Sequence, residues 1–90
     1  MKSVSQTNQF AKDIKRMIRR GKDPAKMQTV VRKLANGEVL DRRHRDHSLV
    51  GEWDSFRDCH IEPDWVLIYF TDAEKLILQR TGTHSDLFKT

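Results

Sequence analysis

Three histidines and one aspartate are the residues of this sequence best suited to acid–base chemistry. In the stretch CHIEPDWVLIY, residues 59–69, His60 and Asp64 stand four positions apart, at the start of an apolar run. His47 lies upstream of this stretch and His84 lies downstream. Imidazole titrates near about pH 6.5, so histidines beside a carboxylate can exchange protons near neutral pH. We therefore take these four residues as candidate acid–base groups.

One reaction suits such groups without a metal. A base removes the proton from an RNA 2′-OH, the oxygen attacks the adjacent phosphorus, and an acid protonates the leaving 5′-oxygen. A cation steadies the phosphorane, and Arg57 and Arg80 are the candidates for it. The alternative is that the histidines and Asp64 hold a divalent metal. Because the ligands lack a paired helical spacing such as H-E-x-x-H, we expect no metal and no cofactor.

The first half of the chain must supply the scaffold. Residues 2–6 alternate weakly and predict a short strand. Residues 7–20 carry apolar side chains at spacings of three and four, with lysines and arginines between them, which predicts an amphipathic basic helix. Asp23 is a suitable N-cap for a second helix, with Pro24 at its first position and Asn36-Gly37 as its stop. A short connection between matching apolar faces predicts a helical hairpin.

The second half predicts three strands. They are expected at Glu52–His60, Trp65–Phe70 and Lys75–Arg80, with a turn at Thr71–Glu74 between the last two. The residues from 82 onward are too few for more than a single turn. The order β-α-α-β-β-β predicts one α+β domain over residues 1–90, with an N-terminal helical hairpin packed on a small antiparallel sheet.

This sheet would bring three of the four candidates to one edge. In an antiparallel sheet the end of one strand lies beside the start of the next, so His60 and Asp64 flank one tight turn. The last strand runs back to the same edge and delivers His84 there. His47 precedes a strand that starts at the opposite edge, so it joins the others only if its loop folds back. Taken singly, each residue is also an ordinary turn or strand-end residue, and the prediction depends on their convergence.

Charge is distributed unevenly along the chain. Residues 1–45 contain thirteen Lys and Arg against four Asp and Glu, a net charge of +9, whereas residues 46–90 carry −5. A basic half of this kind is either a solvated helix surface or a surface for RNA, DNA or an acidic partner.

The single cysteine, Cys59, excludes an internal disulfide and fits a reducing compartment. The longest apolar run, Trp65–Phe70, is much shorter than a membrane span, and we expect a cytoplasmic protein.

Two segments of the chain resemble a known family. DHSLVGEWDSFRDCHIEPDWVLIY, residues 46–69, and RTGTHSDLF, residues 80–88, resemble the YafQ branch of the RelE/ParE toxin superfamily. The family pattern is D-H-x-L, then G-x-W-x-x-x-R-D-x-H-x-x-P-D-W, then a strand, then R-T-G-T-H-x-x-L-F. Every fixed position of this pattern is present in the chain, and the match covers about half of it.

The resemblance implies a bacterial type II toxin with a RelE-like fold, which cleaves mRNA in the ribosomal A site and is paired with a cognate antitoxin. It implies that Phe88 is the tail aromatic of the site and that Trp65 is associated with it, although core packing is the favoured interpretation of Trp65 from the residues alone. We expect His84 to be the general acid. The predicted catalytic residues are His47, His60, Asp64 and His84, and the predicted substrate-binding residues are Arg57, Trp65, Arg80 and Phe88.

Individual roles and other functions remain open on the sequence. His60 or Asp64 is the base or a phosphate partner, and His47 completes the proton network. One alternative function is a binding-only toxin, such as a gyrase poison or a ribosome blocker, and another is a small nucleic-acid-binding module. A poison that does not cleave RNA has no need of the His and Asp set. We expect the basic half to grip ribosomal RNA, and an acidic antitoxin segment to cover the basic helices and the site in a heteromeric complex.

Overall fold

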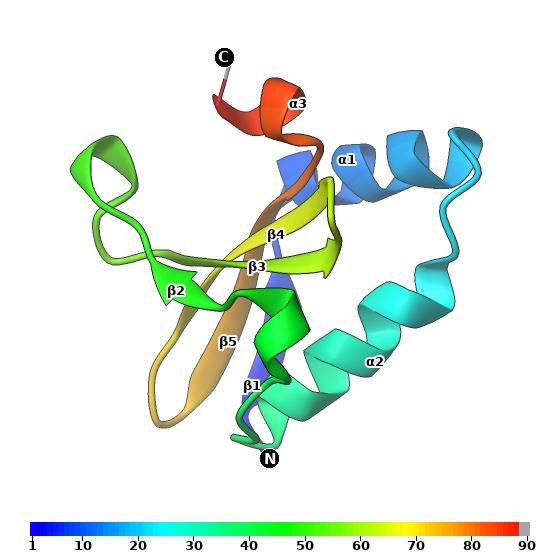
Figure 1. Ribbon diagram of the computed structural model, residues 1–90. Coiled ribbons are helices and arrows are strands. Elements are labelled where there is room, and N and C mark those ends of the chain that lie inside the picture. The colour runs from blue at the N-terminus through cyan, green and yellow to red at the C-terminus, as the bar shows by residue number, and fades with distance from the viewer. Residues whose placement is uncertain (89–90) are drawn as a thin grey trace.

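The computed structural model of the protein describes residues 1–88. Two helices pack against one face of a five-stranded sheet, whose strand order is β1-β5-β4-β3-β2 (Figure 1). Short 3₁₀ turns occupy Arg42–His44 and Gly51–Trp53. The helices and strands are β1 (Ser3–Gln6), α1 (Asn8–Arg19), α2 (Pro24–Ala35), β2 (His47–Ser48), β3 (Arg57–Glu62), β4 (Trp65–Thr71), β5 (Lys75–Gly82) and α3 (His84–Phe88).

Local capping signals begin and end the helices where the sequence predicts them. α1 begins after Thr7, whose hydroxyl accepts a hydrogen bond from the Phe10 N–H at 2.9 Å. Asp23 caps α2 through the Ala25 N–H, also at 2.9 Å. After α2 the chain turns at Gly37, where a φ of 74° suits a residue without a side chain. The two predicted helices and the short connection between them are confirmed.

The two faces of the sheet carry separate apolar clusters. Side chains alternate along a strand, so successive residues of β4 serve different faces. The face under α1 and α2 holds the larger cluster, which includes Met17, Leu34, Trp65, Leu67 and Tyr69. The opposite face holds a smaller one, made of Val66, Ile68 and Leu87 with Leu49, Trp53, Phe56 and Phe88 packed against it. β4 is therefore the buried central strand that its apolar run predicts.

The sheet is mixed, which corrects the prediction of a wholly antiparallel one. β2, β3, β4 and β5 pair in antiparallel fashion, as expected. β1 instead runs parallel to β5, with Ser3 opposite Lys75 and Gln6 opposite Leu78. The chain between β1 and β5 includes both helices, and a long connection of this kind allows parallel pairing, whereas a short hairpin does not.

The predicted strand Glu52–His60 begins too early. β3 spans Arg57–Glu62, and Gly51–Trp53 form a 3₁₀ turn instead. φ is 72° at Gly51 and 82° at Ser55, and neither value is compatible with an extended strand. The two-residue strand β2, which the sequence did not predict, pairs with β3 instead.

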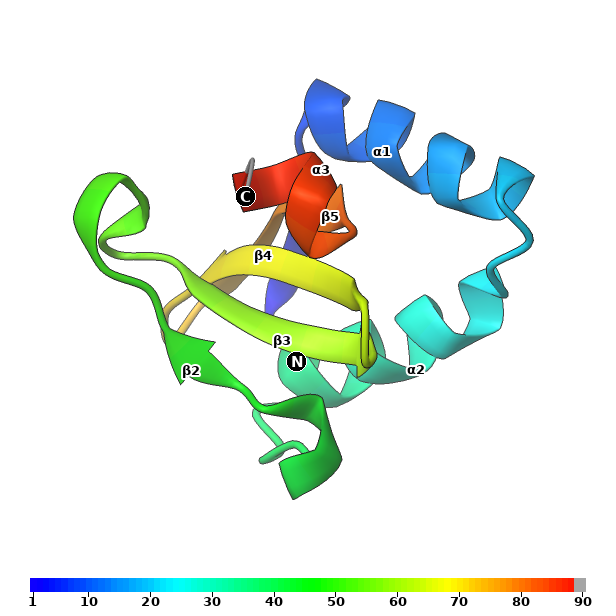
Figure 2. The ribbon, with the colours of Figure 1, turned by 45° about the horizontal axis from the view of Figure 1, so that its top comes forward.

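The C-terminal segment forms the single turn that its length predicts. Helix α3 lies beyond the end of β5 and beside α1, close to the turn between β3 and β4 (Figure 2). The first residue of α3 is a candidate site residue, so the position of this helix determines the geometry of the site. No helix within residues 1–88 is long and apolar enough to cross a membrane.

Candidate active site

His84 and Asp64 make the best-defined polar contact of the candidate site. Asp64 lies in the turn before β4, and its Oδ1 accepts a hydrogen bond from the backbone N–H of His84 at 3.1 Å. The same oxygen lies 2.8 Å from Nδ1 of the His84 ring. Because a carboxylate oxygen only accepts, Nδ1 donates here and Nε2 is left for other partners. These bonds, with the ring contact first, hold the pKa of Asp64 below its usual value.

The rings of His60 and His84 meet edge to face. Their centroids lie 5.1 Å apart and their planes are inclined by 65°. Phe88 stands one helical turn after His84 on α3, with its ring centroid 6.1 Å from that of His84. Burial lowers the pKa of His60, so this imidazole is neutral near pH 7 and can accept a proton.

β2 brings His47 to the same face of the sheet. In the register of β2 and β3, His47 lies opposite Asp58. His47 Nδ1 is 3.1 Å from Asp58 Oδ1 and 2.7 Å from the carbonyl oxygen of Arg45. Asp58 and His60 are two residues apart on β3 and so share a face. The loop that carries His47 thus folds back along the sheet, which is the condition that the sequence left open.

Asp58 is a candidate functional residue that sequence reasoning missed. Its carboxyl group is buried, and Oδ1 has no well-oriented hydrogen bond within residues 1–88. Burial raises the pKa of Asp58, and the charges that His47, His60 and His84 gain on protonation oppose that rise. The period of two on a strand links Asp58 to His60 in the sequence and could have identified it. We refer to His47, Asp58, His60, Asp64 and His84 together as the His–Asp cluster.

A fourth histidine, His44, binds the backbone of the cluster residue His60. His44 is buried, and its Nδ1 lies 2.6 Å from the carbonyl oxygen of His60. Because a carbonyl oxygen only accepts, Nδ1 of His44 is the donor. This bond ties the backbone of His60 to the 3₁₀ turn Arg42–His44. The polar segment around His44 has no periodicity that would have revealed this role.

Trp65 lies under the site rather than in it. Its side chain is 0% exposed and belongs to the helix-facing cluster, so it cannot touch a substrate in this conformation. Its Nε1 donates to the Thr81 hydroxyl at 2.9 Å, and that hydroxyl donates to the Val66 carbonyl oxygen at 2.7 Å. The predicted substrate contact of Trp65 is therefore corrected to a supporting role, which joins β4 to β5 next to His84.

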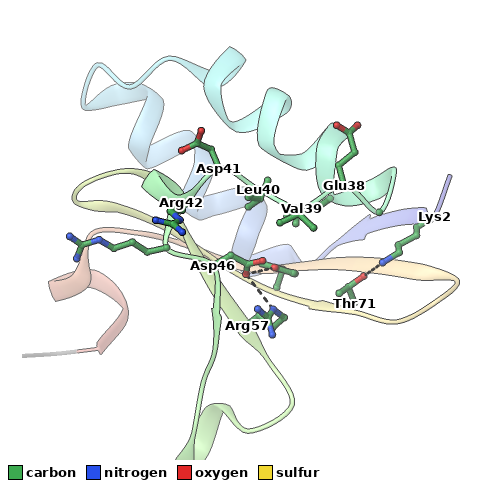
Figure 3. Close-up of a pocket in the computed structure, with 13 residues that line it drawn as sticks. Lys2, Glu38, Val39, Leu40, Asp41, Arg42, Asp46, Arg57 and Thr71 are labelled. Atoms are coloured by element: carbon green, nitrogen blue, oxygen red, sulfur yellow. Dashed lines mark hydrogen bonds and ion pairs between the residues drawn. The ribbon is translucent and has the colours of Figure 1, made fainter.

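Arg57 is separated from the cluster by the sheet itself. It neighbours Asp58 on β3 and so projects to the opposite face, where it pairs with Tyr69 of β4. Its Nε lies 3.3 Å from Asp46 Oδ1, and Nη1 donates to the Ser48 hydroxyl at 2.9 Å. Figure 3 shows Arg57 with Asp46 among the residues that line a pocket beside the loop after α2. This geometry corrects the expectation that Arg57 sits beside the phosphate.

Arg80 is half-buried and anchored by an acid of α1. Its Nε donates to Asp13 Oδ2 at 2.7 Å, and the same oxygen accepts from the Thr81 N–H at 3.2 Å. Burial alone would raise the pKa of Asp13, but the bonds from Arg80 and its other donors outweigh it and lower that pKa. Arg80 also lines a surface hollow together with Leu87 and Phe88. Arg80 is thus the predicted cation that lies within reach of the site.

Comparison with known proteins identifies the family of this chain. A model described as the bacterial toxin of type II toxin–antitoxin system, YafQ, matches residues 2–89. The mRNA interferase toxin YafQ of Escherichia coli is 39% identical over 88 residues, which cover 97% of this chain and 96% of the relative. The chain belongs to the YafQ family. The resemblance that the sequence motifs indicate is confirmed.

Solved structures of similar toxins have the same fold. The toxin in the Escherichia coli DinJ–YafQ toxin–antitoxin complex is 39% identical to this chain, with a TM-score of 0.89 and 97% of each chain covered. A copper-bound mutant toxin from Helicobacter pylori is also 39% identical, with a TM-score of 0.93, covering 98% of this chain and 100% of the other. The α+β fold class is thereby confirmed. Among residues 1–88 here, no group of three or more His, Cys, Asp or Glu is arranged to hold a metal ion.

The sequence motifs of the YafQ family coincide with the elements that build the His–Asp cluster. The D-H-x-L segment forms β2, and the segment that ends in P-D-W forms β3 and the turn into β4. The R-T-G-T-H-x-x-L-F segment forms the end of β5 and all of α3. The parts of the YafQ pattern that are distant in sequence therefore meet at one edge of the sheet.

Proposed function

We propose that this YafQ-family protein is the toxin of a type II toxin–antitoxin pair and is a ribosome-dependent endoribonuclease that cleaves mRNA in the A site. The observation that carries the proposal is the contact between His60 and His84, whose ring centroids lie 5.1 Å apart while Asp64 binds His84. Two adjacent imidazoles can act on opposite sides of one phosphate. The curated relative named as an mRNA interferase supports this reaction class. The family match over residues 2–89 supports one toxin domain.

The reaction is a transesterification in which two histidines divide the proton transfers. His60, neutral because burial lowers its pKa, takes the proton from the 2′-OH. The 2′-oxygen bonds to phosphorus as the bond from phosphorus to the 5′-oxygen breaks. His84, bound through Nδ1 to Asp64, acts as the acid and gives an Nε2 proton to the leaving 5′-oxygen. The products are a 2′,3′-cyclic phosphate and a 5′-hydroxyl, so the cleavage step consumes no water and no cofactor.

Two further residues assist this step: Asp58 stabilises a developing positive charge, and His47 transfers protons. The Asp58 carboxylate faces His47 at 3.1 Å and stabilises the positive charge that His60 gains when it accepts a proton. His47 completes the proton network on the exposed side of Asp58 and carries protons between the cluster and water. With these roles, His60 and His84 remain the base and the acid. The role of Asp58 also explains why a buried carboxylate lies on the face that binds substrate.

Arg80 and Phe88 position the RNA. The Arg80 guanidinium, fixed by Asp13, offers charge to the phosphate from the surface hollow that it shares with Phe88. The Phe88 ring is partly buried at the edge of the cluster and stacks on an unpaired base of the codon. Both side chains are supplied by the R-T-G-T-H-x-x-L-F segment, which also supplies His84.

The partners follow from the charge and from the family. Exposed basic side chains on the two helices and on the turn after them are suited to ribosomal RNA; they include Lys12, Lys15, Arg19, Arg32, Arg42 and Arg43. The structure of a related toxin with DinJ supports a cognate antitoxin, whose acidic segment covers this basic surface and the site in a heteromeric complex. Because translating ribosomes are the target, the proposed place of action is the cytoplasm.

Cleavage of a programmed mRNA on purified ribosomes tests the proposal. The intact protein is compared with His84→Ala and with Ser85→Ala, which alters an exposed neighbour on the same helix. A third arm uses protein treated with EDTA and then added to ribosomes that keep their magnesium. We expect A-site cleavage that leaves a 2′,3′-cyclic phosphate, a loss of at least about 100-fold in His84→Ala, and full activity in the other two arms.

Each departure from this result has a defined meaning. Arrest of translation without cleavage would favour the binding-only alternative. Loss of cleavage after EDTA treatment, restored by added metal, would favour a metal-dependent reaction, for which the copper-bound relative provides a precedent of metal binding. Equal activity of His84→Ala and Ser85→Ala would remove the acid role of His84.

A further inference from the structure

Asp86 connects the helix that carries His84 and Phe88 to the rest of the protein. Its carboxylate is 15% exposed and accepts a hydrogen bond from Arg20 Nη1 at 2.7 Å, with Arg20 Nη2 at 3.4 Å and Arg16 Nη2 at 3.9 Å. Arg20 is the C-terminal cap residue of α1, which is 66 positions earlier in the sequence. The contact with Arg20 holds the pKa of Asp86 well below its usual range, so the ion pair is formed at neutral pH.

The same carboxylate also builds the first turn of α3. Asp86 Oδ2 accepts a hydrogen bond from the Thr83 N–H at 2.9 Å, and the Asp86 N–H donates to the Thr83 hydroxyl at 3.1 Å. This reciprocal pair is a capping box, which satisfies two N–H groups at the start of a helix. A helix of five residues has little stability of its own, so α3 depends on such anchors.

The residue before this turn leaves room for the carboxylate. A Cβ built at Gly82 would lie 2.9 Å from Asp86 Cβ and 2.9 Å from Asp86 Oδ2. Contacts this short would displace the Asp86 side chain. The absence of a side chain at the end of β5 therefore allows Asp86 to reach Thr83 and Arg20 at once.

The helical geometry separates the anchor from the chemistry. His84 and Phe88 are four residues apart and share one side of α3, where their ring centroids lie 6.1 Å apart. Asp86 is two residues from each, which is about 200° around a helix, so it projects away from them. One side of α3 thus faces the His–Asp cluster while the other is fixed to α1.

We propose that Asp86 is a positioning residue, which holds His84 and Phe88 in register with His60 by fixing α3 to Arg20 of α1 and to Thr83. The inference rests on the proposed function, because the groups it aligns are those of the RNA cleavage. Asp86 touches neither substrate nor the reacting atoms. Its effect is on the rate of the chemical step and not on ribosome binding, since the basic surface is unchanged by its removal.

Three substitutions distinguish the effect of the ion pair between Asp86 and Arg20 from that of the hydrogen bonds between Asp86 and Thr83. Asp86→Asn keeps an oxygen that can accept from Thr83 and loses the ion pair, Asp86→Ala loses both contacts, and Arg20→Gln removes the ion pair from the other partner. Lys75→Gln is the matched control, because it removes the same charge from an exposed position at the far end of β5, away from α3 and from the basic surface. Thermal unfolding of every variant confirms that it is folded at the assay temperature.

Single-turnover cleavage on programmed ribosomes gives the main readout. A displacement of about 1 Å can cost about 100-fold in rate, so we expect a loss of about tenfold in Asp86→Asn and in Arg20→Gln, and about 100-fold in Asp86→Ala. The concentration of toxin that gives half the maximal rate should change by less than about threefold in these variants. The double variant Arg20→Gln/Asp86→Asn should be no slower than either single variant, because both remove one interaction.

A second readout does not depend on cleavage. In NMR spectra of the free protein, nuclear Overhauser effects between the His60 and His84 rings report their contact directly. We expect them to weaken in Asp86→Ala and to persist in Lys75→Gln. If the intact protein fails to cleave RNA, the proposed function fails, and this measurement still tests the positioning. Intact ring contacts together with wild-type cleavage by Asp86→Ala would overturn the inference.

Discussion

His47 and Asp58 lie opposite each other across the short pairing of β2 with β3, with His47 Nδ1 3.1 Å from Asp58 Oδ1. This contact links the one histidine that the sequence left apart to the two that it placed together. Asp58 is the connecting group, since it shares a face with His60 and its charge acts on His47, His60 and His84. The proposed active site thus extends from the edge of the sheet, where His60, Asp64 and His84 meet, onto the face that carries Asp58 and His47.

The charge of Asp58 should set the acid limb of the pH profile. Asp58 raises the pKa of His60, and burial lowers it more strongly. In Asp58→Asn the raising effect is gone, so the pKa of His60 falls and more of this base is neutral at low pH. We expect the acid limb of kcat/KM to move to lower pH, measured between about pH 5 and about pH 8.

Asp72→Asn is the control for this shift, because it removes an equal charge in the turn between β4 and β5, where Asp72 accepts hydrogen bonds from Glu74 and Lys75. It should leave the acid limb in place. A limb that moves to higher pH in Asp58→Asn would contradict the assignment of His60 as the base.

The loss of an arginine should slow cleavage only if its side chain lies within reach of the His–Asp cluster. Arg80→Gln should slow single-turnover cleavage by about 100-fold, because it removes a cation beside the phosphate. Arg57→Gln should change this rate by less than about threefold, since its contacts with Asp46 and Ser48 lie on the other face. Both variants are compared at saturating ribosomes. A loss in Arg57→Gln as large as that in Arg80→Gln would place the phosphate elsewhere.

Removal of the buried indole should cost stability. Trp65→Phe loses the hydrogen bond to Thr81 and leaves space in the helix-facing cluster, so the free energy of unfolding should fall by about 2 kcal/mol. Urea denaturation measures this change. Trp53→Phe is the control, since Trp53 is only partly buried and should cost less than about 1 kcal/mol. Equal losses in the two variants would show that full burial of Trp65 and its hydrogen bond to Thr81 add no stability beyond that of a partly buried tryptophan.

Asp13 should make stability depend on acid pH. Its folded-state pKa is lowered, so its stabilising effect is fully present above the pKa of the unfolded chain and is lost as pH falls through the folded value. At pH 7, Asp13→Ala should lower the free energy of unfolding by about 3 kcal/mol, because Arg80 and the Thr81 N–H lose their acceptor.

The difference between wild type and Asp13→Ala should shrink below about pH 4, as protonation removes the same ion pair from the wild type. Chemical denaturation at a series of pH values tests this. A difference that is constant from neutral to acid pH would mean that Asp13 acts through packing and not through its charge.

The basic surface should govern ribosome binding and not the chemical step. Charge reversal at Lys15 and Arg19, both exposed on α1, should weaken binding of the toxin to ribosomes and reduce its dependence on salt. Cleavage at saturating ribosomes should stay within about twofold of wild type. Lys75→Glu, an exposed reversal at the far end of β5, is the control. If binding is unchanged in the α1 variant, another surface contacts the ribosome.

The sequence by itself determined the local features of the protein. Apolar spacing and the caps Thr7 and Asp23 fix α1 and α2 through contacts within a few residues. The apolar run at residues 65–70 fixes β4 as the central strand. The strand-end argument also placed His60, Asp64 and His84 together, because antiparallel neighbours must share an edge.

Only the tertiary structure decided which side chains share a face. The placement of Arg57 away from His60, and of His47 against Asp58, follows from the register between strands, and a shift of one residue would reverse both. The attachment of α3 to α1 through Asp86 joins residues 66 positions apart. Local periodicity carries no information on such pairings, because they depend on how two distant segments meet and not on either segment alone.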